Sequence, residues 1–123
     1  LDEISLASST YVAELKNGEI TEWMITPEDV DIESKTLTGL IVDGSAESLA
    51  LIKDALGKKK SAIGEKAANM LALNAGAGIY VSGLTNDYKQ GVALAHDIIY
   101  GGQALEKMSV LSEFTKTLKE YEA

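Results

Sequence analysis

Several residue types are absent from this sequence or rare in it, and each absence excludes a kind of chemistry. None of the 123 residues is a cysteine, which excludes disulfides, thiolate metal sites and a cysteine nucleophile. None is an arginine, so no guanidinium of this chain can clamp a phosphate with two hydrogen bonds. The single proline and the lack of a low-complexity tract indicate one folded globular domain. No apolar run reaches the roughly 20 residues that a transmembrane helix needs.

The charge balance is acidic, with a formal net charge of −8 at pH 7. Such a chain would not neutralise the phosphates of a nucleic acid or of an anionic membrane, so we expect neither as a partner. The three lysines at 58–60 predict a solvated loop or a partner for the dipole at the C-terminal end of the preceding helix. Because there is no cysteine and no signal peptide, we expect a cytoplasmic location.

The first part of the sequence predicts a β-hairpin. Asn17-Gly18 stands between two alternating runs, and both central residues of a type I′ turn need positive φ. The register that follows pairs Leu15 with Ile20 and Val12 with Trp23. Apolar side chains then lie on both faces of the hairpin, and we expect both faces to be covered, at least in part.

A helical turn and four helices are predicted beyond the hairpin from caps and glycine stops. The predicted positions are a turn after Thr26, a helix from 43–45 to Gly57, a helix from near Ser61 to Ser82, a helix capped at 85–87 and ended at 101–102, and a last helix with apolar residues from 105 to 118 and a frayed tail at 119–120.

The stretch 67–81, AANMLALNAGAGIYV, is apolar on almost every side and predicts a helix that is buried all round. Gly76 and Gly78 within it each cost about 1 kcal/mol relative to alanine. Their expected use is to let a neighbouring backbone come close.

Candidate chemistry is confined to two places. His96 is the only histidine and has no serine or cysteine at nucleophile spacing, so we assign no catalytic residue and expect a surface or half-buried side chain.

Asp2-Glu3 precedes Ile4 and Leu6, whose alternation with polar residues predicts a short strand. Adjacent carboxylates supply the hard oxygen ligands that Mg²⁺ prefers, and the alternative is a solvated acidic corner. Because neighbouring side chains of a strand point to opposite sides, both carboxylates reach one ion only through a turn or through bridging water, and we expect Asp2-Glu3 to be a loop.

Six segments, in the same order and with matching spacing, resemble the C-terminal part of anthranilate phosphoribosyltransferase. They are LDEISL, VAELKNGEI, ITPEDV, DGSAES, ALNAGAGIYVSGL and GQALEKM, and they cover nearly the whole chain. The resemblance implies an α/β fold, the C-terminal portion of the nucleoside phosphorylase/phosphoribosyltransferase-type α/β domain. Residues 1–123 would form a single unit, a β-hairpin-containing strand region followed by about four helices. The sequence departs from the family pattern at Asp31, where glycine often stands, and at Gly76 and Gly78, where alanine is commoner.

In that family the amine of anthranilate displaces diphosphate from phosphoribosyl diphosphate, a step of tryptophan biosynthesis. The resemblance implies that Asp2 and Glu3 bind the Mg²⁺ that accompanies the diphosphate. The family's Gly-rich diphosphate loop, its KHGN stretch and the N-terminal helical domain that forms its homodimer would all precede Leu1. We therefore expect a fragment that carries one corner of the active site and is inactive alone.

Two other interpretations remain open. A non-catalytic helical interaction module would also combine apolar helices, an acidic surface and no motif. A nucleoside phosphorylase relative would share the general fold. The gene upstream of Leu1 distinguishes them, because a Gly-rich diphosphate loop and a KHGN stretch there would favour the transferase.

Overall fold

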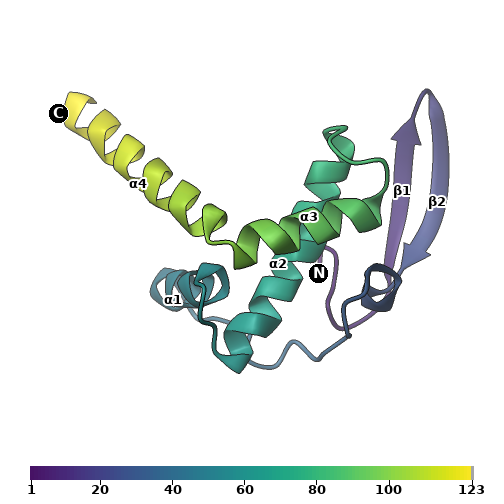
Figure 1. Cartoon of the computed structure of the whole chain (residues 1–123), viewed down its shortest axis with the longest axis horizontal. Coiled ribbons are helices and arrows are strands. Elements are labelled where there is room, and N and C mark those ends of the chain that lie inside the picture. Colours follow the sequence, from purple (N-terminus) through teal and green to yellow (C-terminus); the bar gives the residue numbers. More distant parts are fainter. Residues whose placement is uncertain (123) are drawn as a thin grey trace.

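The structure, a computed structural model, describes residues 1–122 and has a hairpin followed by helices (Figure 1). Strands β1 (Thr10–Lys16) and β2 (Glu19–Ile25) pair antiparallel and are followed by the short 3-10 helix η1 (Pro27–Val30). The helices are α1 (Ser45–Leu56), α2 (Ala62–Val81), α3 (Tyr88–Tyr100) and α4 (Gln103–Glu122). This order confirms the expected α/β fold of a hairpin-containing strand region followed by four helices.

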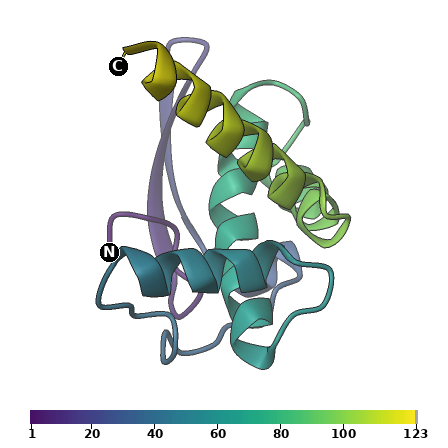
Figure 2. The same cartoon turned by 90° about the vertical axis from the view of Figure 1, so that its left-hand side faces the viewer.

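Helix α2 is the element around which the others are arranged. It runs through the centre of the molecule, with α3 packed across it and the hairpin standing to one side (Figure 1). Helix α4 leads away from the rest of the molecule in Figure 1, and Figure 2 looks at the molecule from the side on which α4 lies. The buried core is apolar and lies mainly between α2 and α3, where Leu73 and Val92 are 1% and 2% exposed.

The hairpin has the predicted turn and register. Asn17 and Gly18 have φ of 54° and 78°, and the strands pair Leu15 with Ile20 and Val12 with Trp23. The expectation that both faces are covered is wrong. Four large apolar side chains share the outer face and are 61–72% exposed: Tyr11, Leu15, Ile20 and Met24. Only the opposite face, with Val12 and Trp23, turns toward the helices.

The strand predicted at Ile4 and Leu6 is wrong, since residues 1–9 form a loop. A strand needs a neighbouring strand to satisfy its backbone, and here other groups do so. The backbone of Ile4 bonds to the side chain of Asn74, and the carbonyl of Leu6 accepts from the Lys35 N–H at 3.2 Å. The buried Leu6 side chain anchors the segment to the core.

The two glycines of α2 differ in role. A Cβ added to Gly76 would lie 2.5–2.6 Å from Val92, against its Cγ2, Cα and backbone N, so α3 approaches α2 closely at this point. Gly91 is the glycine of α3 at the same crossing, and a Cβ added to it would lie 2.3 Å from the Gly76 carbonyl oxygen. Gly78 has open space around it. The predicted close approach is therefore confirmed for Gly76 and wrong for Gly78.

Two further expectations about the helices are wrong. Helix α2 is not buried all round, because Val81 is 77% exposed and Ala75 also faces solvent. The tail at 119–120 is not frayed, since α4 continues to Glu122 although none of its residues is buried. Within residues 1–122, no helix has both the length and the apolar character needed to cross a membrane.

Local side-chain bonds fix where α2 and α3 begin. The hydroxyl of Ser61 accepts from the Gly64 N–H at 3.0 Å and caps α2. The carboxylate of Asp87 accepts from the Gln90 N–H at 2.8 Å and caps α3. Both caps stand where the sequence predicts them, because a serine or aspartate there satisfies an amide that has no partner inside the helix.

Candidate functional site

Asp2 and Glu3 lie on an exposed loop that leads into the buried pair Ser5-Leu6. The loop conformation expected for this pair is confirmed. Among residues 1–122, no group of three or more His, Cys, Asp or Glu side chains is placed to hold a metal. Two carboxylates alone are a donor set that fits Mg²⁺, which takes its other ligands from substrate phosphates and water.

The loop is tied to α2 by one side chain that sequence reasoning missed. The Oδ1 of Asn74 accepts from the Ile4 N–H at 2.9 Å, and its Nδ2 donates to the Ile4 carbonyl at 2.9 Å. The hydroxyl of Thr10 accepts from the Ser5 N–H at 3.1 Å and holds the next residue. The only signal in the sequence was a polar residue in the middle of an apolar helix. That signal does not show that its partner is Ile4, 70 residues away.

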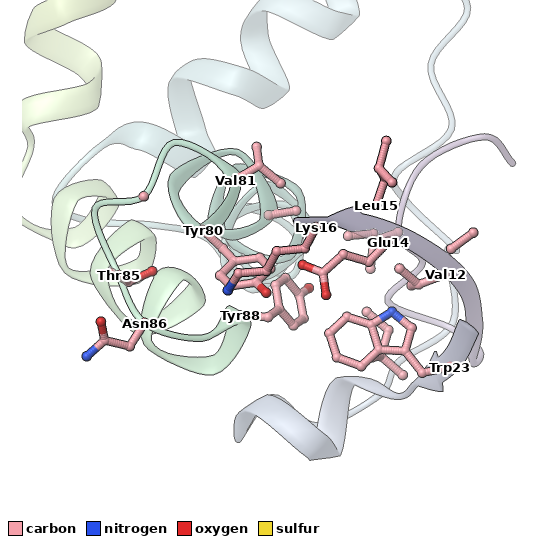
Figure 3. Close-up of a pocket in the computed structure, with 15 residues that line it drawn as sticks. Val12, Glu14, Leu15, Lys16, Trp23, Tyr80, Val81, Thr85, Asn86 and Tyr88 are labelled. Carbon is pink, nitrogen blue, oxygen red and sulfur yellow. The ribbon is translucent and has the colours of Figure 1, made fainter. Parts of the chain in front are cut away.

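A cleft of about 520 Å³ lies between the inner face of the hairpin and the C-terminal end of α2 with the start of α3 (Figure 3). Its volume is within the range typical of small-molecule sites, roughly 300–1,000 Å³. Ile4 lines the cleft, so the Asp2-Glu3 loop stands at its margin. Aromatic and aliphatic side chains form most of the wall: Val12, Trp23, Ile25, Tyr80 and Tyr88.

Charged groups of β1 face the aromatic wall of this cleft. Glu14 and Tyr80 point toward one another in Figure 3, and their hydrogen bond, followed by burial, raises the pKa of the Tyr80 phenol. The Lys16 Nζ lies 5.6 Å from the centre of the Tyr80 ring. The wall therefore combines an acid, a cation and a phenol that sequence analysis did not bring together, because β1 and α2 are far apart in the chain.

Tyr88 closes the inner end of the cleft and joins α3 to α2. Its hydroxyl donates to the Leu73 carbonyl at 2.8 Å, and burial raises the pKa of Tyr88 to about 12. The phenol therefore stays protonated and donating through the neutral pH range. This residue is structural, since its polar atom is used inside the fold.

His96 lies away from the first cleft, on a second one of about 450 Å³ beside η1. It is half-buried and stacks on the Tyr100 ring, with 4.3 Å between ring centroids and 21° between planes. At another part of this cleft Lys89 and Asp31 form an ion pair at 3.2 Å. The half-buried environment expected of His96 is confirmed. Among the described residues that line this cleft there is no serine or threonine for it to activate.

The chain matches a known protein family over most of its length. The match covers residues 1–105 and the family is described as the glycosyl transferase family, a/b domain. Among curated proteins, the anthranilate phosphoribosyltransferase of Acinetobacter baylyi is 81% identical over 121 residues, which is 98% of this chain. Those residues are 35% of that relative, so the chain spans about a third of the length of the proteins it resembles.

Two solved structures share the arrangement of the elements. The crystal structure of anthranilate phosphoribosyltransferase from Thermus thermophilus is 33% identical, with a TM-score of 0.72 over 85% of this chain and 30% of that one. The enzyme from Saccharomyces cerevisiae, solved with 4-fluoroanthranilate, is 21% identical and has a TM-score of 0.72. It covers 89% of this chain and 31% of that one, and at this identity it bears on the fold alone.

Proposed function

This chain belongs to the glycosyl transferase family through its a/b domain, and on that premise we propose that it is part of an anthranilate phosphoribosyltransferase. In the reaction, the amine nitrogen of anthranilate bonds to the ribose carbon that carries the diphosphate. The bond from that carbon to the diphosphate oxygen breaks, and the amine loses a proton. The observation that carries the proposal is the identity of 81% over nearly the whole chain to an enzyme of that name.

We propose that Asp2 and Glu3 hold Mg²⁺ against the diphosphate in the intact enzyme. Both side chains are exposed on a loop, so both can turn toward one ion, directly or through water. When bound, the ion neutralises the charge that the diphosphate gains as it leaves. The two carboxylates orient that leaving group, and the ties at Ile4 and Ser5 keep their loop in place.

The 123-residue chain is expected to be inactive alone. The transfer reaction needs two substrates held in the correct relative position, and it needs several groups to neutralise the charge of the diphosphate. This chain supplies one acidic corner, has no arginine and carries a net charge of −8. We propose that the intact enzyme makes the remaining contacts to its two substrates. The same proposal includes a homodimer and a cytoplasmic location for the intact enzyme.

The test compares the full-length protein encoded by the gene with the 123-residue chain. Consumption of anthranilate is followed by its fluorescence with phosphoribosyl diphosphate and Mg²⁺ present, and only the full-length protein is expected to turn over. Asp2→Asn and Glu3→Gln in that protein should lower turnover at saturating substrate and raise the Mg²⁺ requirement.

Glu120→Gln, an exposed change on α4 that also removes one negative charge, is the matched control. It should leave both quantities unchanged. Full-length protein that cleaves a nucleoside with phosphate but does not consume anthranilate would favour the phosphorylase alternative. Turnover by the isolated chain would refute its expected inactivity. If the Asp2 and Glu3 variants have unchanged rates across a Mg²⁺ titration, the pair does not bind the metal and is only a solvated acidic corner.

A further inference from the structure

We infer that Asn74 of α2 is a positioning residue that fixes the direction of the Asp2 and Glu3 carboxylates. The inference rests on the proposed function, in which those carboxylates hold Mg²⁺. Asn74 touches neither substrate nor metal in this reading and acts through the backbone of the loop. The inference therefore gives a side chain in the middle of the central helix a role in metal binding.

The two hydrogen bonds of Asn74 fall on the peptide next to the acidic pair. The Ile4 N–H that bonds to Oδ1 at 2.9 Å belongs to the Glu3–Ile4 peptide, so this bond fixes the plane in which the backbone leaves Glu3. The bond from Nδ2 to the Ile4 carbonyl at 2.9 Å fixes the far side of the same residue. Together they reproduce the paired bonds that an antiparallel strand would make.

Asn74 is itself held in one orientation. Its Nδ2 also donates to the Met70 carbonyl at 3.0 Å, one turn back in α2. A rotated amide would bring an oxygen against two carbonyl oxygens, so only one of its two orientations is satisfied. The residue before it, Leu73, is 1% exposed, which places Asn74 beside the buried core of α2.

Other anchors of the loop do not replace this one. The burial of Leu6, its carbonyl's bond to Lys35 and the bond from the Ser5 N–H to the Thr10 hydroxyl hold the chain two and three residues beyond Glu3. Rotation about the bonds between Glu3 and Ser5 could still swing both carboxylates with those anchors in place. Asn74 is the tie that removes this freedom, and groups of this kind behind metal ligands typically change metal affinity about 10–100-fold when removed.

The experiment uses the full-length enzyme with Asn74→Leu, which keeps the shape of the side chain and removes its donors and acceptor. Asn69→Leu makes the same exchange in the same helix, at a half-buried side chain outside the Ile4 contact, and is the control. Asn74→Ala is the second variant if the leucine variant does not fold. Folding is checked by circular dichroism and the melting temperature.

Three quantities are measured: the affinity for Mn²⁺ with inorganic diphosphate, the Mg²⁺ requirement of turnover, and hydrogen exchange of the Ile4 amide. We expect Mn²⁺ binding to weaken about 10–100-fold and the Mg²⁺ concentration for half-maximal turnover to rise by the same factor. Excess Mg²⁺ should restore kcat, and the Ile4 amide should exchange faster. The control should match the wild type in all three.

The inference is overturned if a folded Asn74 variant binds Mn²⁺ as tightly as the wild type, or loses kcat that excess Mg²⁺ does not restore. The proposed function fails in a different way. If Asp2→Asn and Glu3→Gln also leave Mn²⁺ affinity unchanged, the metal site itself is refuted and the positioning role with it. If those two variants weaken Mn²⁺ binding and Asn74→Leu does not, only the role of Asn74 is refuted.

Discussion

The crossing of α2 and α3 gives a sharp prediction, because two glycines of one helix meet opposite surroundings. Changing either Gly76 or Gly78 to alanine removes the same conformational freedom from the unfolded chain and gains about 1 kcal/mol of helix propensity. Only at Gly76 does the added methyl group meet another element, at 2.5–2.6 Å from Val92. The difference between the two variants therefore isolates the cost of the close approach.

The magnitude follows from what has to move. Two of the three atoms nearest the new methyl group are backbone atoms of Val92, so a change of rotamer cannot relieve the contact. The helices must separate by roughly 1 Å, which weakens the dispersion contacts along their interface. Overpacking of this kind costs about 1–3 kcal/mol. We expect Gly76→Ala to destabilise by up to about 2 kcal/mol after the propensity gain, and Gly78→Ala to stabilise by up to about 1 kcal/mol.

Urea unfolding of the 123-residue chain, followed by circular dichroism, measures the difference. The separation of about 1–3 kcal/mol, which is the cost of overpacking, corresponds to midpoints roughly 0.5–1.5 M apart for a urea m-value near 2 kcal/mol per M. Gly76→Leu should lower the midpoint further, because the larger side chain meets the same backbone. If Gly76→Ala and Gly78→Ala raise the midpoint equally, the close approach of α3 to α2 is refuted.

Two further predictions concern hydrogen bonds of single side chains. Tyr88→Phe should cost about 1 kcal/mol at neutral pH, because the hydrogen bond from the Tyr88 hydroxyl to the Leu73 carbonyl is lost. The folded-state pKa of Tyr88, about 12, lies above the value near 10 of an unfolded tyrosine, so its contribution is complete below pH 10 and lost between pH 10 and 12. Urea midpoints across that window should fall less in Tyr88→Phe than in the wild type, and equal falls would contradict the assignment. Ser61→Ala should cost about 1 kcal/mol through the lost cap of α2. It should also return the lowered pKa of Asp54 toward its ordinary value, since the Ser61 hydroxyl is its main cause; an NMR titration with no change in that pKa would rule this out.

Features set by neighbouring residues could be predicted from the sequence. The turn at Asn17-Gly18 and the caps at Ser61 and Asp87 depend on backbone angles and bonds within three residues. The strand register then follows from the turn, because the loop length fixes which residues face each other.

Features that depend on distant surroundings could not be predicted. Gly76 and Gly78 look alike in the sequence, and only the path of α3 distinguishes them. Alternation at Ile4 and Leu6 indicates a strand, but a strand forms only where a partner strand lies beside it. The outer face of the hairpin is apolar by pattern and still exposed, because none of the described residues packs over it. Asp2 and Glu3 could be assigned as Mg²⁺ ligands of a diphosphate only through the resemblance, and the amide that bonds to the next residue, Ile4, lies 70 residues away from it.

That separation has a consequence for the order in which the chain folds. The bonds between Ile4 and Asn74 close a loop of 70 residues, and the chain entropy of closing it is on the order of 4 kcal/mol. Two hydrogen bonds, each worth about 1 kcal/mol net, cannot hold such a loop closed by themselves. We therefore expect this loop to close only after α2 and α3 have packed and the burial of Leu6 has brought the first residues to them. The acidic segment leaves the ribosome before the rest of this chain and is ordered among the last, so no short peptide from this end will reproduce it.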